Sequence, residues 1–358
     1  MRAGRSGGAA PDGALVAALS AQIDATLARL VAPGERVALV NFPNHANAGD
    51  PALWLGELAS LRRIGARVVH VASWASYRRD ALARALAPGG TILLHGGGNF
   101  GDLYPHNQAT TRERVLADFP RQRTIQLPQS LWFREAANRD RLRALCEAHA
   151  DFTLLVREAQ SLDLARTHFA VPSLLCPDMA FALGTLPRAA APAIDVLWLA
   201  RTDLEAAGWT PPADDPRIAV VDWLGPVPDE PRVPWRHRVA GAVNARLHAE
   251  AAGGRMRSPV RARLLASTFA PMARRWVTRG LQVLARGRVV VTDRLHGHIL
   301  ALLQGIPHVV LDNSYGKVRS TFTTWTSASG VAHWTSSADE ARALATALAA
   351  GGAACASS

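Results

Sequence analysis

The sequence predicts an α/β protein made of two Rossmann-like domains that face each other across a cleft. From Arg36, short apolar runs rich in β-formers alternate with segments of helical spacing, which is typical of βαβ units around a parallel sheet. The Pro- and Ala-rich passage LGTLPRAAAPA (183–193) breaks this alternation, and a second series of apolar runs follows it. With 358 residues, of which 49% are hydrophobic, the chain can form two cores.

Ten apolar runs are the predicted strands. Those of the first domain are RVALVNF (36–42), ARVVHVA (66–72), TILLHGG (91–97), RTIQLPQ (123–129), FTLLVRE (152–158) and SLLCPD (173–178). Those of the second are IDVLWLAR (194–201), RIAVVDW (217–223), RVVVTD (288–293) and PHVVLDN (307–313). An Arg- and Ala-rich region from about Arg236 to Arg286 predicts helices. We divide the chain into an N-terminal helical extension (1–35), two domains (36–185 and 186–335), and a C-terminal helix and tail (336–358).

The composition predicts a soluble protein of a reducing cytoplasm. Cys146, Cys176 and Cys355 are few, odd in number and widely spaced, so we expect no disulfide framework. Gln22 and Asp24 interrupt the apolar segment near the N-terminus, and no run approaches the ~18 apolar residues that span a bilayer. The formal charge of +11 comes almost wholly from arginine and could reflect a base-rich genome, and the nucleic-acid-binding patterns are missing, so we expect no nucleic-acid partner.

The stretch VVVTDRLHGHILALLQGIPHVVLDNSYGK gathers titratable groups at the carboxyl ends of two predicted strands. Asp293 is the expected N-cap of a helix, and Arg294 and His296 fall in its first turn, where the dipole and free N–H groups favour an anion. Lys317 is the chain's one lysine and follows the next strand, on the same rim. Arg294 and His296 could simply cap and solvate the helix, but three such groups on one rim favour a binding site.

Two glycine- and asparagine-containing loops follow strands of the first domain. NFPNHANAGDPALW carries His45, Asn47 and Asp50, and Asp50 suits the N-cap of a helix with Pro51 at its first position. LLHGGGNFGDLYPHN places three glycines after a strand, where the backbone can approach a ligand closely. It matches neither the P-loop nor the dinucleotide fingerprint, so we expect no nucleotide cofactor.

These motifs together resemble the polysaccharide pyruvyl transferase family. VTDRLHGHILALLQGIPHVVLDNSYGKV, NHANAGDPALW and LLHGGGNFGDLYPHNQ carry the likeness, which runs from about Val37 to Trp325. The resemblance implies a fold similar to the GT-B glycosyltransferases. It also implies a reaction in which phosphoenolpyruvate transfers its pyruvyl group to a sugar, forming a ketal and releasing phosphate.

The donor carries two acidic groups, which arginine binds well through its forked N–H groups. We expect Arg294 and Leu295 at the helix start, together with Lys317, to bind it. The resemblance places a further donor-binding arginine at a strand end, which is Arg157 here; the alternative is an ion pair with Glu158.

The reaction needs an acid that protonates the methylene carbon and a base for the sugar hydroxyls. His296, carried over from the RLH motif, is the predicted acid. Asp50 is the predicted base, with helix capping as its alternative role. The predicted acceptor-binding residues are His45, Asn47, Asn99, Asp102, His106 and Gln129.

No metal-binding spacing appears, so we predict no metal and no cofactor besides phosphoenolpyruvate as co-substrate. Two other functions stay open: a GT-B glycosyltransferase that uses a nucleotide sugar, and a noncatalytic phosphosugar-binding protein. The Arg-rich region from about Arg236 to Arg286 is either a solvated helical surface or a contact with anionic membrane lipid. The acceptor, free or lipid-linked, its hydroxyl pair, the ketal stereochemistry and the oligomeric state are not specified by the sequence.

Overall fold

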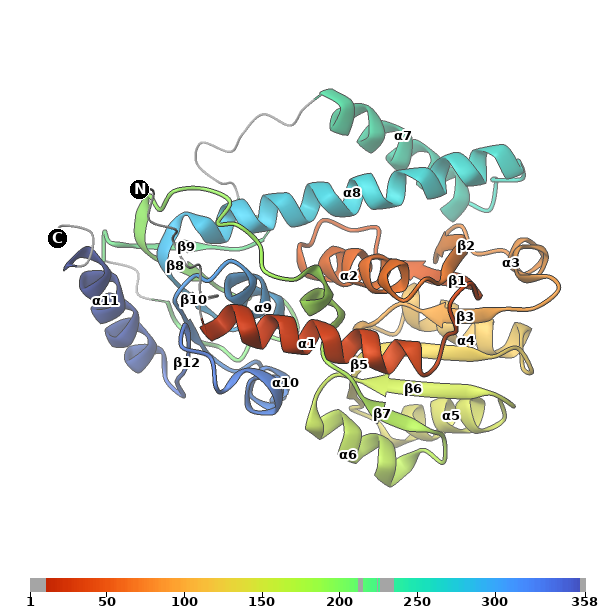
Figure 1. Cartoon of the computed structure of the whole chain (residues 1–358), viewed down its shortest axis with the longest axis horizontal. Helices are drawn as coiled ribbons and strands as arrows, with labels where there is room; N and C mark the ends of the chain where they lie inside the picture. The colour runs from red at the N-terminus through yellow and green to blue at the C-terminus, as the bar shows by residue number, and fades with distance from the viewer. Residues whose placement is uncertain (1–10, 212–214, 224, 226–234, 355–358) are drawn as a thin grey trace, which may run out of the picture.

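The computed structural model describes residues 11–211, 215–223, 225 and 235–354, which form two parallel β-sheets with helices packed around them (Figure 1). In the first sheet the strand order is β2-β1-β3-β5-β6-β7, and β4 pairs with β5. Its strands are β1 (Arg36–Phe42), β2 (Arg67–Ser73), β3 (Thr91–Leu94), β4 (Gly97–Gly101), β5 (Thr124–Trp132), β6 (Phe152–Val156) and β7 (Ser173–Leu175).

The second sheet has the order β12-β11-β10-β8-β9 and is also parallel throughout. Its strands are β8 (Ile194–Leu199), β9 (Ile218–Val221), β10 (Gly287–Thr292), β11 (His308–Val310) and β12 (Ala332–Trp334). The central strands β10 and β11 are apolar and buried, because helices cover both faces of such sheets. The predicted α/β fold with two Rossmann-like domains is confirmed. The domain limits at 185 and 186 stay a prediction.

The helices follow the alternation that the sequence predicts. Those before the second sheet are α1 (Pro11–Ala28), α2 (Gly49–Arg63), α3 (Arg79–Leu86), α4 (Gln108–Asp118), α5 (Ala136–Glu147), α6 (Ala159–His168) and the 3₁₀ turn η1 (Met179–Leu183). Those after its first strand are α7 (Trp235–Ala252), α8 (Pro259–Ala285), α9 (Leu295–Leu303), α10 (Lys317–Thr321), the π-helical turn η2 (Phe322–Thr326) and α11 (Ala338–Ala354).

One hydrophobic core joins the two halves of the chain. Phe42 of β1 stacks on Phe269 of the long helix α8, with ring centroids 4.2 Å apart, and meets Trp54 of α2 edge-on. Helix α2 also approaches η1 closely, because a Cβ on Gly56 would lie 1.8 Å from the carbonyl oxygen of Met179. Glycine at this position therefore lets α2 pack against the segment that leads from one sheet to the other.

The structure corrects two predicted helix caps. Helix α2 begins at Gly49, so Asp50 lies inside the first turn and is not the cap. The N–H of Gly49 donates a hydrogen bond to Asn47 Oδ1 at 2.8 Å. Helix α9 begins at Leu295, and Asp293 does not cap it: its Oδ1 is buried and has no hydrogen-bond partner among the described residues. Two strands were not predicted from the sequence: β4, whose glycines carry no apolar pattern, and β12, which is only three residues long.

Candidate active site

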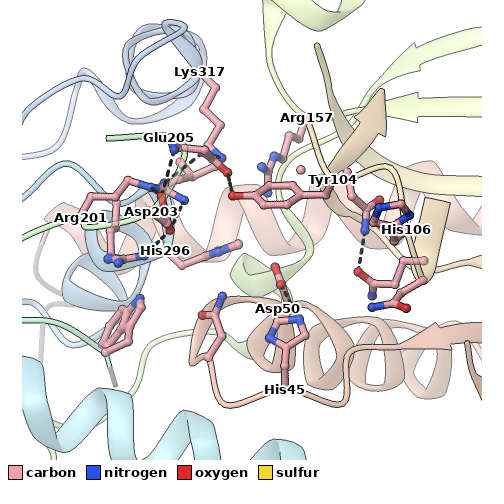
Figure 2. A pocket seen from close by; sticks show the side chains of 18 residues that line it. His45, Asp50, Tyr104, His106, Arg157, Arg201, Asp203, Glu205, His296 and Lys317 are labelled. Carbon is pink, nitrogen blue, oxygen red and sulfur yellow. Dashed lines mark hydrogen bonds and ion pairs between the residues drawn. The ribbon is translucent and has the colours of Figure 1, made fainter. Parts of the chain in front are cut away.

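A cavity of about 300 Å³ opens between the carboxyl ends of the two sheets. Side chains from both domains line it and converge on its centre (Figure 2). Ten predicted site residues are among those that line it: His45, Asn47, Asp50, Asn99, His106, Arg157, Arg294, Leu295, His296 and Lys317. The topology thus brings together loops that lie more than 200 residues apart in the sequence.

A fully buried carboxylate, Asp178, connects the two halves of this cavity. Its Oδ2 accepts a hydrogen bond from Arg157 Nη1 at 2.8 Å, from the end of β6, and lies 3.3 Å from His296 Nε2 in the first turn of α9. Its Oδ1 accepts the N–H of Ala180 at 2.9 Å and so caps η1. One side chain therefore orients both the predicted donor arginine and the predicted acid.

Charge keeps Asp178 ionised in spite of its burial. Burial alone would raise the pKa of its carboxyl, but His296 and Arg157 outweigh this and hold the pKa at about 2. The predicted alternative for Arg157, an ion pair with Glu158, is present as well, at 3.6 Å. Arg157 is thus held by two carboxylates, while its Nη2 makes no hydrogen bond within the described part of the chain and lies at the cavity.

Lys317 and Arg201 share a second buried carboxylate, Glu205. Glu205 Oε2 pairs with Lys317 Nζ and with Arg201 Nη1, the latter at 3.1 Å, and its Oε1 accepts the hydroxyl of Tyr104 at 3.1 Å. Tyr104 reaches Glu205 from the first domain, so this contact spans the cavity (Figure 2). Burial lowers the pKa of Lys317 and Glu205 opposes it, and with the repulsion of Arg201 and Arg157 the pKa falls to about 8.

The guanidinium of Arg294 is already paired in the structure. Its Nη2 lies 2.6 Å from Asp222 Oδ1, its Nη1 lies 3.4 Å from Asp203 Oδ2, and its Nε donates to the carbonyl of Ala200. Arg294 therefore ties the start of α9 to the ends of β8 and β9. Leu295 and His296, in the first turn of α9, both line the cavity, and the N–H groups of a first helical turn have no partner within the helix. The anion site at this helix start stays a prediction.

Asp50 and His45 form an ion pair at the opposite wall. The His45 Nε2 lies 3.1 Å from Asp50 Oδ2. Burial would raise the pKa of Asp50, but His45 and the more distant His296 and His95 drive it well below its usual range, so the carboxylate is ionised. Gly49 brings this wall against His296, since a Cβ there would lie 2.1 Å from His296 Nδ1.

Three predicted acceptor residues have structural roles. The side chain of Asn99 lines the cavity, but its Nδ2 donates to Gln108 and its Oδ1 accepts from Gln129 at 3.0 Å. Gln129 is fully buried behind it and does not line the cavity. Asp102 accepts the N–H groups at the start of α5 and also lies outside the lining. Of the predicted acceptor residues, Gln129 and Asp102 thus lie outside the cavity lining, which corrects their expected position. Asn99, His45, Asn47 and the exposed His106 line the cavity, and their role in binding the acceptor stays a prediction.

Sequence reasoning missed four charged residues of the site. Asp178 was placed only as the end of a strand run, and Arg201, Asp203 and Glu205 follow β8 in the stretch ARTDLEA. The signal was present, because these residues follow the carboxyl end of a strand in the same way as Arg157 does. No group of three or more His, Cys, Asp or Glu side chains in the described ranges is arranged to hold a metal ion.

Comparison with known proteins identifies the family. The family model for polysaccharide pyruvyl transferase matches residues 47–225 and 278–315. The chain belongs to the polysaccharide pyruvyl transferase family. Both matched segments contribute to the cavity, and membership supports pyruvyl transfer onto a polysaccharide.

Individual relatives agree with this assignment. Pyruvyl transferase 1 of Schizosaccharomyces pombe is 35% identical over 311 residues, which cover 81% of this chain and 70% of that protein. EpsO of Bacillus subtilis, assigned as a pyruvyl transferase, is 29% identical over 80% of this chain and 84% of its own length. A functionally uncharacterised protein of Klebsiella pneumoniae has the same fold, with a TM-score of 0.55 at 17% identity over 89% of this chain and 99% of that protein.

Replacing Asp178 by Asn should destabilise the protein by about 3–5 kcal/mol, because removing one partner of a buried ion pair leaves an uncompensated charge. Urea denaturation measures this loss. Asp140→Asn is the matched control: its pairs with Arg139 and Arg143 are at the surface, so its effect should stay within about 1 kcal/mol. Equal effects of the two substitutions would contradict the central position of Asp178.

Proposed function

We propose that the cavity transfers the pyruvyl group of phosphoenolpyruvate to two hydroxyls of one sugar, forming a cyclic ketal and releasing phosphate. The observation that carries this proposal is the position of His296. Its ring lies between a cationic wall, with Arg157 and Lys317, and the wall that holds Asp50 and His45 (Figure 2). An acid between an anion seat and a carboxylate base is the arrangement that ketal formation requires.

The cationic wall suits a donor with a phosphate and a carboxylate. A Cβ on Gly98 would lie 3.2 Å from Arg157 Nη2 and 3.4 Å from Lys317 Nζ, so the two cations face the same short stretch of glycine backbone. A forked guanidinium and an ammonium beside a helix start can together hold two anionic groups. In this proposal Leu295 contributes its backbone N–H, and Arg294 fixes the helix start through its own ion pairs.

The chemistry balances with these residues alone. His296 donates a proton to the methylene carbon of the enol, which leaves a cationic centre at the neighbouring carbon. One sugar hydroxyl adds there and loses its proton, the C–O bond to phosphate breaks, and the second hydroxyl closes the ketal. One of the two hydroxyl protons restores His296, and the other leaves with phosphate. Asp178 supports the acid step, because it contacts His296 Nε2 and stabilises the protonated ring.

Asp50 is the proposed base. It is ionised at neutral pH, which is the form that accepts a proton. Its lowered pKa makes it a weak base by itself, so His45, whose Nε2 lies 3.1 Å from Asp50 Oδ2, is the second acceptor for the proton. The acceptor sugar would lie against Asn47, Tyr104 and His106 at the mouth of the cavity.

We further propose that the acceptor is an exopolysaccharide unit, either polymeric or lipid-linked. We also propose that the protein is cytoplasmic and contacts the surface of the membrane. None of the described helices is both long and apolar enough to cross a bilayer.

Donor identity tests the proposed reaction. We incubate the protein with phosphoenolpyruvate and a panel of sugars that carry neighbouring hydroxyl pairs, and follow phosphate release and product mass. We expect phosphate together with a pyruvyl ketal. His296→Ala should lower kcat about 10²–10⁴-fold and leave calorimetric binding of phosphoenolpyruvate nearly unchanged. His168→Ala, in the last turn of α6, is the control and should keep full activity. A product formed only from a nucleotide sugar would refute the proposal.

The pH profile tests Lys317. Its ammonium, with a pKa of about 8, is charged below that pH and neutral above it, so kcat/KM for phosphoenolpyruvate should fall about tenfold per pH unit above 8. In Lys317→Arg this alkaline fall should disappear, because a guanidinium stays protonated throughout the range. An identical alkaline limb in the two proteins would show that another group titrates.

A further inference from the structure

The positive charge of the protein is concentrated on one helical hairpin, formed by α7 and α8. Residues 235–286 contain eleven arginines and a single acidic residue, Glu250, so this segment carries +10 of the formal charge of +11. Figure 1 shows the hairpin on one side of the molecule, with α7 lying beyond α8 as seen from the sheets. The charge is therefore a property of one surface and not of the whole protein.

The same hairpin exposes large apolar side chains. Trp235 and Val239 of α7 are 77% and 53% exposed, and Val260 and Leu264 of α8 are 71% and 50% exposed. Other apolar residues of the hairpin, such as Leu247 and Leu265, are the buried ones, so the exposed four have no role in the core. A single exposed apolar side chain is ordinary on a protein surface, but four on one hairpin indicate a surface that binds a partner.

Several arginines of the hairpin carry a charge that no carboxylate in the described residues neutralises. Arg261 pairs with Glu250. Four exposed arginines make no ion pair within the parts of the chain that the structure describes: Arg246, Arg257, Arg263 and Arg274. Their charge is thus not neutralised by the fold, and a surface of this kind favours an anionic partner.

We propose that the α7–α8 hairpin docks on an anionic lipid bilayer. Helices that lie in a membrane interface combine basic side chains with Trp, Leu and Val, and each basic residue near the surface adds attraction to acidic headgroups. The apolar residues favour lipid over nucleic acid, because three of the four, Val239, Val260 and Leu264, have no ring on which a base could stack, and Trp235 is equally suited to a membrane interface.

Docking has a consequence for the proposed function, on which this step rests. A groove of about 460 Å³ lies between the hairpin and the loop after β1, and Arg238, Arg275 and Trp276 line it together with His45. His45 also lines the catalytic cavity. A hairpin on the membrane would hold the acceptor entrance next to the lipid surface, where a lipid-linked sugar would be presented.

Vesicle sedimentation tests the docking. We use vesicles of phosphatidylcholine alone and of phosphatidylcholine with 30% phosphatidylglycerol. We expect binding only to the anionic vesicles, weakened by salt. The triple variant Arg246→Glu, Arg263→Glu, Arg274→Glu should bind at least about tenfold more weakly. Replacing Val239, Val260 and Leu264 by Ser should also weaken binding, at unchanged charge. Circular dichroism verifies that each variant is folded.

The control variant makes the same charge change elsewhere, by Arg84→Glu, Arg121→Glu and Arg166→Glu at exposed positions of the first domain. It should bind like the wild type. Equal binding to neutral and anionic vesicles, an equal loss in the control, or binding to duplex RNA without binding to vesicles would each overturn the proposal. The assay contains neither donor nor acceptor, so its failure leaves the proposed reaction standing, and a failed transfer assay leaves the docking standing.

Discussion

A carboxylate with no access to solvent, Asp178, is the interaction on which the site depends. It stands where the chain leaves the first sheet, and it contacts an arginine of that domain and a histidine of the other. Asp178 is the buried counter-ion of Arg157, and its contact with His296 Nε2 orients the imidazole ring. Because the same oxygen contacts both, one side chain sets the distance between Arg157, the proposed anion-binding group, and His296, the proposed proton donor.

The cavity exists only when the two domains are packed together. Close backbone approaches make this possible: Gly49 lies against the His296 ring, and Gly56 lies against the turn that Asp178 caps. The buried aromatic cluster of Phe42, Trp54 and Phe269, the last of them on the long helix α8, packs the two domains together. The packing of the two domains therefore also fixes the positions of the side chains that line the cavity.

The strands could be predicted from the apolar runs in the sequence, and the site residues that follow them could be predicted only in part. Ten predicted strands are present because buried parallel strands leave apolar runs. The glycine-rich β4 left none. Both predicted caps failed because α2 already begins at Gly49 and α9 begins only at Leu295, and neither N-cap, Ala48 or Arg294, makes a side-chain cap hydrogen bond. Arg294 was identified as a site residue, but its neutralisation by Asp203 and Asp222 depends on loops far away in sequence, which no local pattern specifies.

A crystal structure with phosphoenolpyruvate and no acceptor would show directly whether Arg157, Lys317 and His296 bind the donor as proposed. The account predicts an anionic oxygen of the donor within hydrogen-bond distance of both Arg157 Nη2 and Lys317 Nζ, with the methylene carbon facing the ring of His296. A donor bound outside the cavity, or bound with its methylene carbon turned away from His296, would contradict it.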